Sequence, residues 1–449
     1  MVLNEKTIFE MAKAHLIESK LLDDQLQFEL VSVQGCGDFN GVAYASKMYY
    51  LQNVKAFVGP SCSDEMTAVA KLATIWNIPL IGYVSSDGYL DNKLIYRTLA
   101  RISMSASNGI TDAVVALLRH FGWQRVSIAT SESTVAAKII SEFEAKFAVN
   151  NIEIIAKVVF PENMTAEEYI ASDKLRKIRE TSRIVIVLFG SSLSDCVDFM
   201  RAIHLEGMDN DEYMYLLPWL YHDVTSRAPW WTPNGTIIPS IKSDFNRAIV
   251  IDNEGILDIA NNNFMARVLN ETTLNTSNLT QALTMTSIHS YLEMFDALKL
   301  YVIAVRKAIN ESGQQDIYLD GRYIWNKMRS VRFDGVSGPV IMDDQAERVP
   351  LYAVFFVDPE QAELTKIISI EPRRMPNCDG LINNTGCFEM FLTDVGDGVW
   401  PFKDGKLPSD TPECGFLGEK CDHKVQIAVG VAIIIIILTV VAILIRFQY

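Results

Sequence analysis

Polar side chains that follow predicted apolar strands are the residues of this sequence best placed to bind a ligand. In an α/β protein the carboxyl ends of parallel strands meet at one edge of the sheet, and ligands bind there. Solvated or helix-capping loops carry the same residue types, which is the alternative at every position. The candidates for a ligand cleft are Ser85, Ser86, Asp87, Ser131, Glu132, Ser191 and Ser192.

A second candidate is the turn at residues 59–63, between a predicted strand and a predicted helix. The unpaired N–H groups at a helix amino end can hold an anion. The alternative is structural: Gly59 and Pro60 shape the turn, and Ser63 or Asp64 caps the helix.

The sequence offers little evidence of a catalytic site. The motifs HExxH, GxSxG and GxxxxGK[ST] do not occur, and the six histidines lack metal-ligand spacing. We therefore expect no enzyme activity in this chain, and neither a metal nor a cofactor.

The bulk composition is that of a folded protein with more than one domain. A chain of 449 residues exceeds what one core usually serves, and 49% apolar with 21% charged residues argues against disorder. The net charge of −15 repels polyanions, so nucleic acid is not the expected partner. Peptides, small molecules and other proteins remain open as ligands.

The elements that would position the candidate residues alternate between helices and short apolar strands. The pattern starts with a helix at 7–19 and a strand at 27–33, and it continues to about residue 219. Such βα repetition predicts an α/β fold with parallel sheets covered by helices on both faces. Two successive runs predict two lobes with a cleft between them. A continuous apolar stripe at 287–309 predicts one long packing helix.

The segment 425–445 predicts a membrane span. It holds one strongly polar residue, Gln426, and 21 residues at about 1.5 Å each cover roughly 32 Å. Residues 446–449 follow it. Glycosylation sequons place the long preceding segment outside the cell, as in a single-pass type I protein of the cell membrane. They lie at Asn163, Asn234, Asn270, Asn275, Asn278, Asn310 and Asn383.

Seven cysteines in an extracellular segment imply disulfides, and the odd count leaves one over. Cys414 and Cys421 would close a small loop just outside the membrane. Cys378 and Cys387 lie nine residues apart in a stretch rich in Gly and Asn. Cys196 falls in a helical pattern, where a buried thiol is expected.

Four stretches resemble, in this order, the ligand-binding region shared by natriuretic-peptide-type receptors and receptor guanylyl cyclases, the nematode branch in particular. They are VKAFVGPSCSDEMTAVAKLATIWNIPLIGY, LLRHFGWQRVSIAT, EMFDALKLYVIAVRKAI and FDGVSGPVIMDDQAERVPLYAVFFV. PECGFLGEKC is similar to the family's last disulfide loop. The resemblance implies a bilobed type I periplasmic-binding-protein fold, a Cys36–Cys62 disulfide, chloride near Ser61 and Cys62, and a homodimer.

The expected domains follow from this resemblance. The ligand-binding region is 1–372, with lobe 1 at about 1–122 and 284–330 and lobe 2 at about 123–283 and 331–372. A disulfide-containing stalk at 373–424, the span at 425–445 and a cytoplasmic stub at 446–449 complete the chain.

The sequence departs from the family at three places. Gln345 and Ala346 stand where the closing hairpin usually has Asn-Gly, and no kinase-like or cyclase domain follows the span. The family also opens with a central apolar strand that lies ahead of this sequence, so we expect residues 1–424 to fold poorly alone.

The expected function is the ligand-binding and anchoring part of a receptor of the guanylyl cyclase family, which signals through cGMP. A clearance or decoy receptor without a cyclase domain is one alternative. A membrane-tethered solute-binding protein is another.

Overall fold

The structure is a computed structural model. It describes residues 5–24, 26–33, 35–36, 40–85, 87–103, 107–189, 193–218, 230, 236–254, 285–357, 364–378, 387–395, 407–418 and 420–421.

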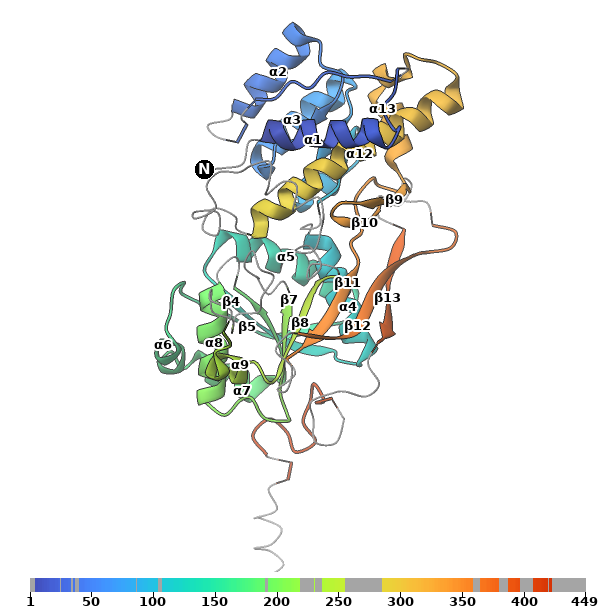
Figure 1. Cartoon of the computed structure of the whole chain (residues 1–449). Coiled ribbons are helices and arrows are strands. Elements are labelled where there is room, and N and C mark those ends of the chain that lie inside the picture. Colours follow the sequence, from blue (N-terminus) through green and yellow to red (C-terminus); the bar gives the residue numbers. More distant parts are fainter. Residues whose placement is uncertain are drawn as a thin grey trace, which may run out of the picture.

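The first lobe surrounds a parallel three-stranded sheet of order β1-β2-β3 (Figure 1). Its strands are β1 (Phe57–Val58), β2 (Leu80–Gly82) and β3 (Leu99–Arg101). Its helices are α1 (Glu5–Glu18), α2 (Asn40–Gln52), α3 (Ser63–Trp76), η1 (Gly88–Asp91), α12 (Met285–Ser312), η4 (Ile317–Leu319) and α13 (Gly321–Met328). The hairpin β9 (Arg332–Gly335) and β10 (Gly338–Ile341) completes it.

Side-chain alternation along these short strands gives the first lobe a core on each face of its sheet. Leu80 and Leu99 pack into one core with α2 and α3. Ile81 and Ala100 pack into the other, with α1, α12 and α13. The apolar strands predicted from the sequence are therefore buried on both sides.

The second lobe surrounds an eight-stranded sheet of order β13-β12-β11-β8-β7-β6-β4-β5. Strands β4 to β8 are parallel, and β11, β12 and β13 continue the sheet antiparallel to them. The strands are β4 (Arg125–Ser131), β5 (Glu153–Phe160), β6 (Ile184–Leu188), β7 (Met214–Pro218), β8 (Ala248–Asn253), β11 (Tyr352–Phe356), β12 (Thr365–Arg374) and β13 (Phe388–Asp394).

Helices cover both faces of this second sheet. Helices α4 (Ser107–His120) and α5 (Thr134–Val149) lie on one face. The other face is covered by α6 (Ala166–Ala171), α7 (Lys174–Thr181), α8 (Leu193–Leu205) and α9 (Pro239–Asp244). The expected α/β architecture with parallel strands is confirmed.

The helical pattern at 166–181 is divided into two helices. The pattern at 166–181 forms α6 and α7, because Asp173 between them has a left-handed backbone with φ 58°. A residue in that conformation cannot continue a right-handed helix.

The boundaries between the two lobes fall at different residues from those expected. Helix α4, expected in lobe 1, packs on the second sheet, and the β9–β10 hairpin, expected in lobe 2, packs in the first lobe. Strand β13 lies inside the expected stalk. An apolar stripe shows that a helix buries one face, but not which sheet that face covers.

The strand expected at 27–33 is extended but is not part of a sheet. Within the described chain, none of these residues makes a backbone–backbone hydrogen bond. They line a cavity of about 570 Å³, here called the strand groove, together with α1, α2, α12 and the edge strand β1. Val31 and Val33 are 46% and 39% exposed there. The groove thus has an unpaired extended segment on one side and an unpaired strand edge on the other.

We expect an apolar strand joined ahead of Met1 to enter the strand groove and stabilise the first lobe. Pairing on two edges adds several backbone hydrogen bonds at roughly 1 kcal/mol each. The free energy of unfolding should rise by about 3 kcal/mol or more, measured by denaturant unfolding, and secretion should improve. A Gly-Ser segment of equal length is the control, and equal stability of the two proteins would contradict the expectation.

Three disulfides are present, linking Cys36 to Cys62, Cys378 to Cys387, and Cys414 to Cys421. The Cys36–Cys62 and Cys414–Cys421 pairings are the expected ones. Cys196 is a free, buried thiol, and burial raises its pKa to about 12, so it stays protonated at neutral pH.

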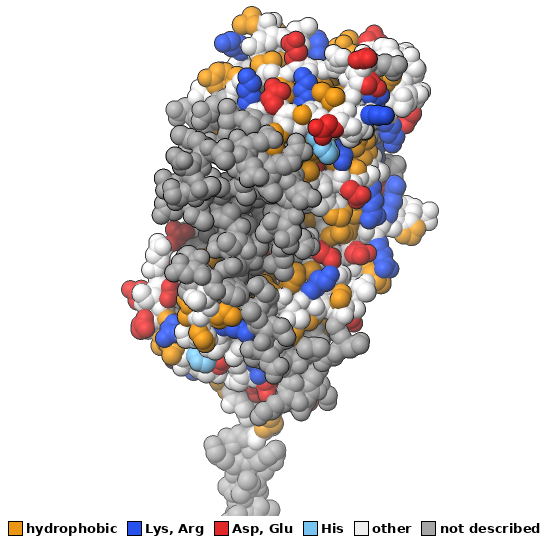
Figure 2. Space-filling model, viewed as in Figure 1, with side chains coloured by type: hydrophobic (Ala, Val, Ile, Leu, Met, Phe, Trp, Pro, Cys, Tyr) orange, Lys and Arg blue, Asp and Glu red, His pale blue; other side chains and the backbone are white. Residues whose placement is uncertain are grey.

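The predicted span at 425–445 lies outside the described residues. Among the residues that the structure does describe, no helix is both long and apolar enough to cross a membrane. Acidic and basic side chains are interspersed over the described part of the face in Figure 2.

Candidate ligand cleft and ionic cluster between the lobes

Two of the predicted ligand residues are serines with buried hydroxyl groups, and they lie at the carboxyl ends of parallel strands. Ser85 follows β2 and Ser131 ends β4, and both residues are at least 97% buried. Neither hydroxyl has a hydrogen-bond partner within the described chain. Buried hydroxyls are normally paired, so a ligand or water is the natural partner for each.

The other predicted ligand residues have structural contacts or are not described. Asp87 caps η1 by accepting a hydrogen bond from the Tyr89 N–H at 3.1 Å, which is the capping alternative. Glu132 is exposed, and its N–H donates to the Phe160 carbonyl. Ser86, Ser191 and Ser192 lie outside the described residues.

The segment after β2 lies against α5, the helix that follows β4, across the two lobes. Gly88 of η1 lies against Glu142 of α5, and a Cβ atom at position 88 would lie 2.9 Å from the Glu142 carboxylate. The two lobes therefore approach closely beside the strand ends that carry Ser85 and Ser131.

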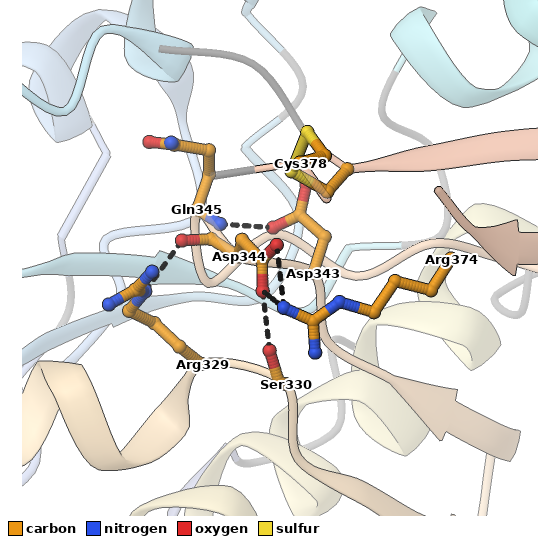
Figure 3. Close-up of a disulfide and its surroundings, with 8 residues drawn as sticks. Arg329, Ser330, Asp343, Asp344, Gln345, Arg374 and Cys378 are labelled. Carbon is orange, nitrogen blue, oxygen red and sulfur yellow. Dashed lines mark hydrogen bonds and ion pairs between the residues drawn. A yellow bond between two sulfur atoms is a disulfide. The ribbon is translucent and has the colours of Figure 1, made fainter. Parts of the chain in front are cut away.

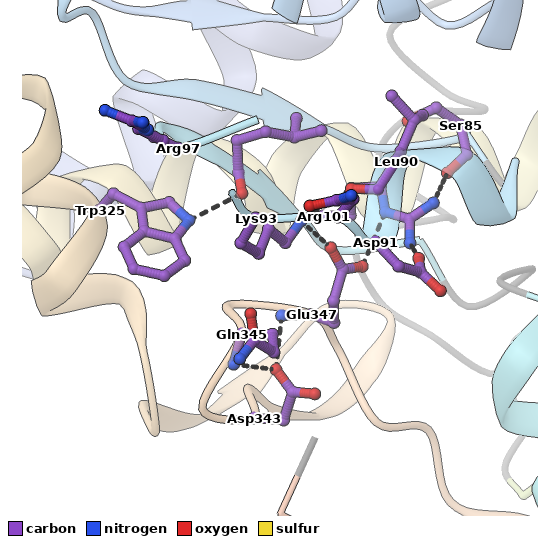
Figure 4. Close-up of polar contacts among 12 residues, drawn as sticks. Ser85, Leu90, Asp91, Lys93, Arg97, Arg101, Trp325, Asp343, Gln345 and Glu347 are labelled. Carbon is purple, nitrogen blue, oxygen red and sulfur yellow. Dashed lines mark hydrogen bonds and ion pairs between the residues drawn. The ribbon is translucent and has the colours of Figure 1, made fainter. Parts of the chain in front are cut away.

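A buried set of charges, here called the ionic cluster, lies where the chain crosses between the lobes (Figure 4). It consists of Asp91, Lys93, Arg101 and Glu347. The Arg101 Nε donates to Glu347 at 2.7 Å, and the guanidinium also pairs with Asp91. Lys93 pairs with the other Glu347 oxygen. Arg101 ends β3, while Glu347 is 246 residues further along the chain.

The backbone reinforces this contact. The Arg101 N–H donates to the Ala346 carbonyl, and the Arg348 N–H donates to the Arg101 carbonyl, both at 2.9 Å. Residues 343–347, here called the crossing turn, thus extend the edge of the first sheet just before the chain enters β11. The two segments that cross between the lobes are fixed side by side.

Burial and the neighbouring charges shift the pKa values of these groups in opposite directions. It lowers the pKa of Lys93, which the charge of Glu347 opposes, and it raises the pKa of Glu347, which Arg101 and Lys93 oppose. Burial also opposes the charge on Arg101, but Glu347 and Asp91 outweigh it and raise the pKa of Arg101.

Asp343 shapes the crossing turn. Its Oδ1 accepts hydrogen bonds from the N–H groups of Gln345 and Glu347 at 2.7 and 2.8 Å, and Ala346 adopts a left-handed φ of 56°. Burial, followed by the charge of Glu347, raises the pKa of Asp343 to about 7.

The neighbouring Asp344 joins the crossing turn to the end of β12, at the side of the second sheet that faces the first lobe (Figure 3). Its carboxylate accepts a hydrogen bond from the Ser330 hydroxyl at 2.6 Å and pairs with Arg374 at 3.1 Å. Arg374 ends β12, four residues before Cys378 of the second disulfide.

A second buried pair closes the β9–β10 turn. Asp296 of α12 accepts hydrogen bonds from the Val336 and Ser337 N–H groups, both at 2.9 Å. Arg348 donates to the Ser337 hydroxyl at 2.7 Å. Burial raises the pKa of Asp296 and lowers that of Arg348. A Cβ at Gly335 would lie 2.3 Å from the Asp296 carboxylate, so this turn requires glycine.

The described part of the segment that follows β13, 407–418 and 420–421, docks on the second lobe. Asp410 accepts hydrogen bonds from the N–H groups of Gln124 and Arg125, and the Trp123 indole donates to the Pro408 carbonyl. Arg183 donates to the Phe416 carbonyl at 2.8 Å and lies between the rings of Tyr213 and Phe416.

The chain belongs to the receptor family ligand-binding region, whose family model matches residues 4–360. It is 39% identical to the receptor-type guanylate cyclase gcy-8 of Caenorhabditis elegans, over 96% of this chain and 38% of that protein. It is 37% identical to gcy-23 of the same organism, also a receptor-type guanylate cyclase, over 95% of this chain and 40% of that protein. The chain therefore spans about two fifths of the length of these relatives, and the family resemblance is confirmed.

We expect Arg101→Met to destabilise the protein strongly. It leaves the largely buried Glu347 carboxylate with Lys93 as its partner and removes the partner of the partly exposed Asp91. Breaking a buried ion pair typically costs about 3 to 5 kcal/mol. Denaturant unfolding would measure the loss. Arg97→Met removes an exposed arginine from the same segment and should change stability by less than about 1 kcal/mol. Equal effects of the two substitutions would contradict a structural role for the ionic cluster.

The raised pKa of Asp343 predicts stability that falls as pH rises. The folded state holds this proton up to about pH 7, whereas an unfolded Asp loses it near pH 4. Stability from this group is therefore present below about pH 4 and is lost as pH rises to about 7. Thermal unfolding between pH 4 and 8 should show a shallower decline in Asp343→Asn than in the wild type. The exposed Asp316→Asn is the control, and identical pH profiles in all three proteins would refute the assignment.

Proposed function

We propose that this chain is the extracellular ligand-binding region and membrane anchor of a receptor-type guanylate cyclase, in the bilobed type I periplasmic-binding-protein fold. The observation that carries the proposal is the family match over residues 4–360. Two α/β lobes with separate cores and adjacent strand ends support the bilobed fold. The cyclase activity, and cGMP as the signal, are carried over from the relatives.

The proposed topology is type I, with residues 1–424 outside the cell and the span at 425–445. Asn163 and Asn310 are exposed, as glycan attachment requires. The other five sequons lie outside the described residues. The proposed ligand is a peptide or small molecule that contacts Ser85 and Ser131, and the proposed assembly is a homodimer.

In mechanism, the ionic cluster and the Asp296–Arg348 pair fix the crossing segments, so that the lobes move as two bodies about this region. A ligand at the strand ends draws the η1 loop toward α5. Because 407–421 docks on the second lobe, a change in the angle between the lobes reaches the membrane through that lobe.

We expect charge at position 88 to shift signalling in opposite directions. Gly88→Lys attracts the Glu142 carboxylate and favours closed lobes, whereas Gly88→Glu repels it and favours open ones. The readout is basal cGMP from a chimaera in which this chain precedes the intracellular region of gcy-8, corrected for surface expression. The Gly88→Lys and Gly88→Glu values should fall on opposite sides of the wild-type value.

The matched controls are Gln314→Lys and Gln314→Glu, because Gln314 is exposed and does not have a left-handed backbone. They should leave cGMP unchanged. If both position-88 variants also match the wild type while remaining at the cell surface, lobe closure is not the signal. A glycosidase-sensitive mass of the surface protein tests the topology in the same cells.

A further inference from the structure

The buried carboxylate of Glu65 connects three parts of the first lobe. Glu65 lies in the first turn of α3 and is 4% exposed. Its Oε2 atom accepts hydrogen bonds from the Gly41 N–H at 2.7 Å and the Cys36 N–H at 3.1 Å. Gly41 is in the first turn of α2, and Cys36 is half of the first disulfide. One negative charge thus serves the amino end of a helix and the disulfide loop together.

The space around this carboxylate is built for it. A Cβ atom at Gly41 would lie 2.0 Å from Oε2, so residue 41 has no side chain where the carboxylate lies. The Glu65 carboxylate and the two sulfurs of the Cys36–Cys62 disulfide lie within 4.8 Å of one another. These sulfurs are bonded to each other, so they offer no thiolate to a metal ion.

The donors expected to hold chloride are already engaged. The Cys62 N–H donates to the Cys36 sulfur at 2.9 Å, and the Ser61 hydroxyl lies 3.2 Å from the same sulfur. A halide beside them would also lie next to the Glu65 carboxylate, and two buried negative charges at that range repel strongly. The residues present therefore do not fit a bound chloride.

We propose that the Glu65 carboxylate is a built-in anion that takes the place of a dissolved halide in this lobe. It satisfies the N–H groups of Cys36 and Gly41 and holds α2 against the disulfide loop. The stability of the lobe is then independent of chloride, and removing the carboxylate creates a halide site.

The test is halide rescue of Glu65→Ala in the full chain, purified in detergent. Thermal unfolding is compared in sodium gluconate and sodium chloride at equal ionic strength. The wild type should melt at the same temperature in both. Glu65→Ala should melt about 5 °C lower in gluconate and recover at least half of the loss as chloride replaces gluconate.

Two further variants separate the effect of the space that the Glu65 side chain fills from the effect of its charge. Glu65→Gln removes the charge but fills the space, so it should be destabilised without chloride rescue. Asp64→Ala removes the exposed neighbouring carboxylate and should resemble the wild type in both salts. Wild-type melting that rises saturably with chloride would overturn the proposal, as would a Glu65→Ala variant with wild-type melting.

Should Glu65→Ala fail to fold, the wild type alone decides. Broadening of the chloride-35 resonance by wild-type protein, reversed by bromide, would show a bound halide and overturn the proposal. The same line width for the wild type and for a detergent blank would support it.

Discussion

The ion pairs between Arg101 and its carboxylates hold together two segments that lie 246 residues apart in the chain. Lys93 and Arg101 are buried and Glu347 is largely so, and buried charges are tolerable only when each has an opposite charge within hydrogen-bonding distance, which fixes their geometry. The crossing turn must therefore lie against β3, and β11 must start from that place.

The same constraint organises the neighbouring turns. The Asp343 carboxylate accepts hydrogen bonds from the backbone of its own turn, and Asp344 forms an ion pair with Arg374. Arg348 donates a hydrogen bond to the β9–β10 turn. Three polar side chains of one short segment thus hold the turn itself, the end of β12 and the β9–β10 turn. The segment acts as a junction, and the departure of Gln345 and Ala346 from Asn-Gly falls within it.

The sequence predicted the α/β architecture well, because strands buried on both faces appear as short apolar runs between amphipathic helices. It missed β3, which has three residues and ends in the charged Arg101, and β13, which alternates within a stretch rich in Gly and Asn. The ionic cluster was also missed. Lys93 and Glu347 look like surface charges in the sequence, and only their packing partners, far away in the chain, show that they are buried. The positions of Ser85 and Ser131 at strand ends were predictable because the end of an apolar strand is a local signal, and their role as ligand residues stays a prediction.

The docking of the segment that follows β13 has a mechanical consequence. Asp410, Pro408 and Phe416 are held by residues of the second lobe, near the ends of β4 and β6 away from the ligand residues. The carboxyl ends of these strands face the first lobe, and their amino ends lie at residues 408–416. A strand is stiff along its length, so the second sheet moves as a rigid body from the carboxyl ends of its parallel strands to their amino ends. A rotation of the second sheet at Ser131 would therefore rotate the segment at Asp410 by the same angle. The residues between them would keep their hydrogen bonds.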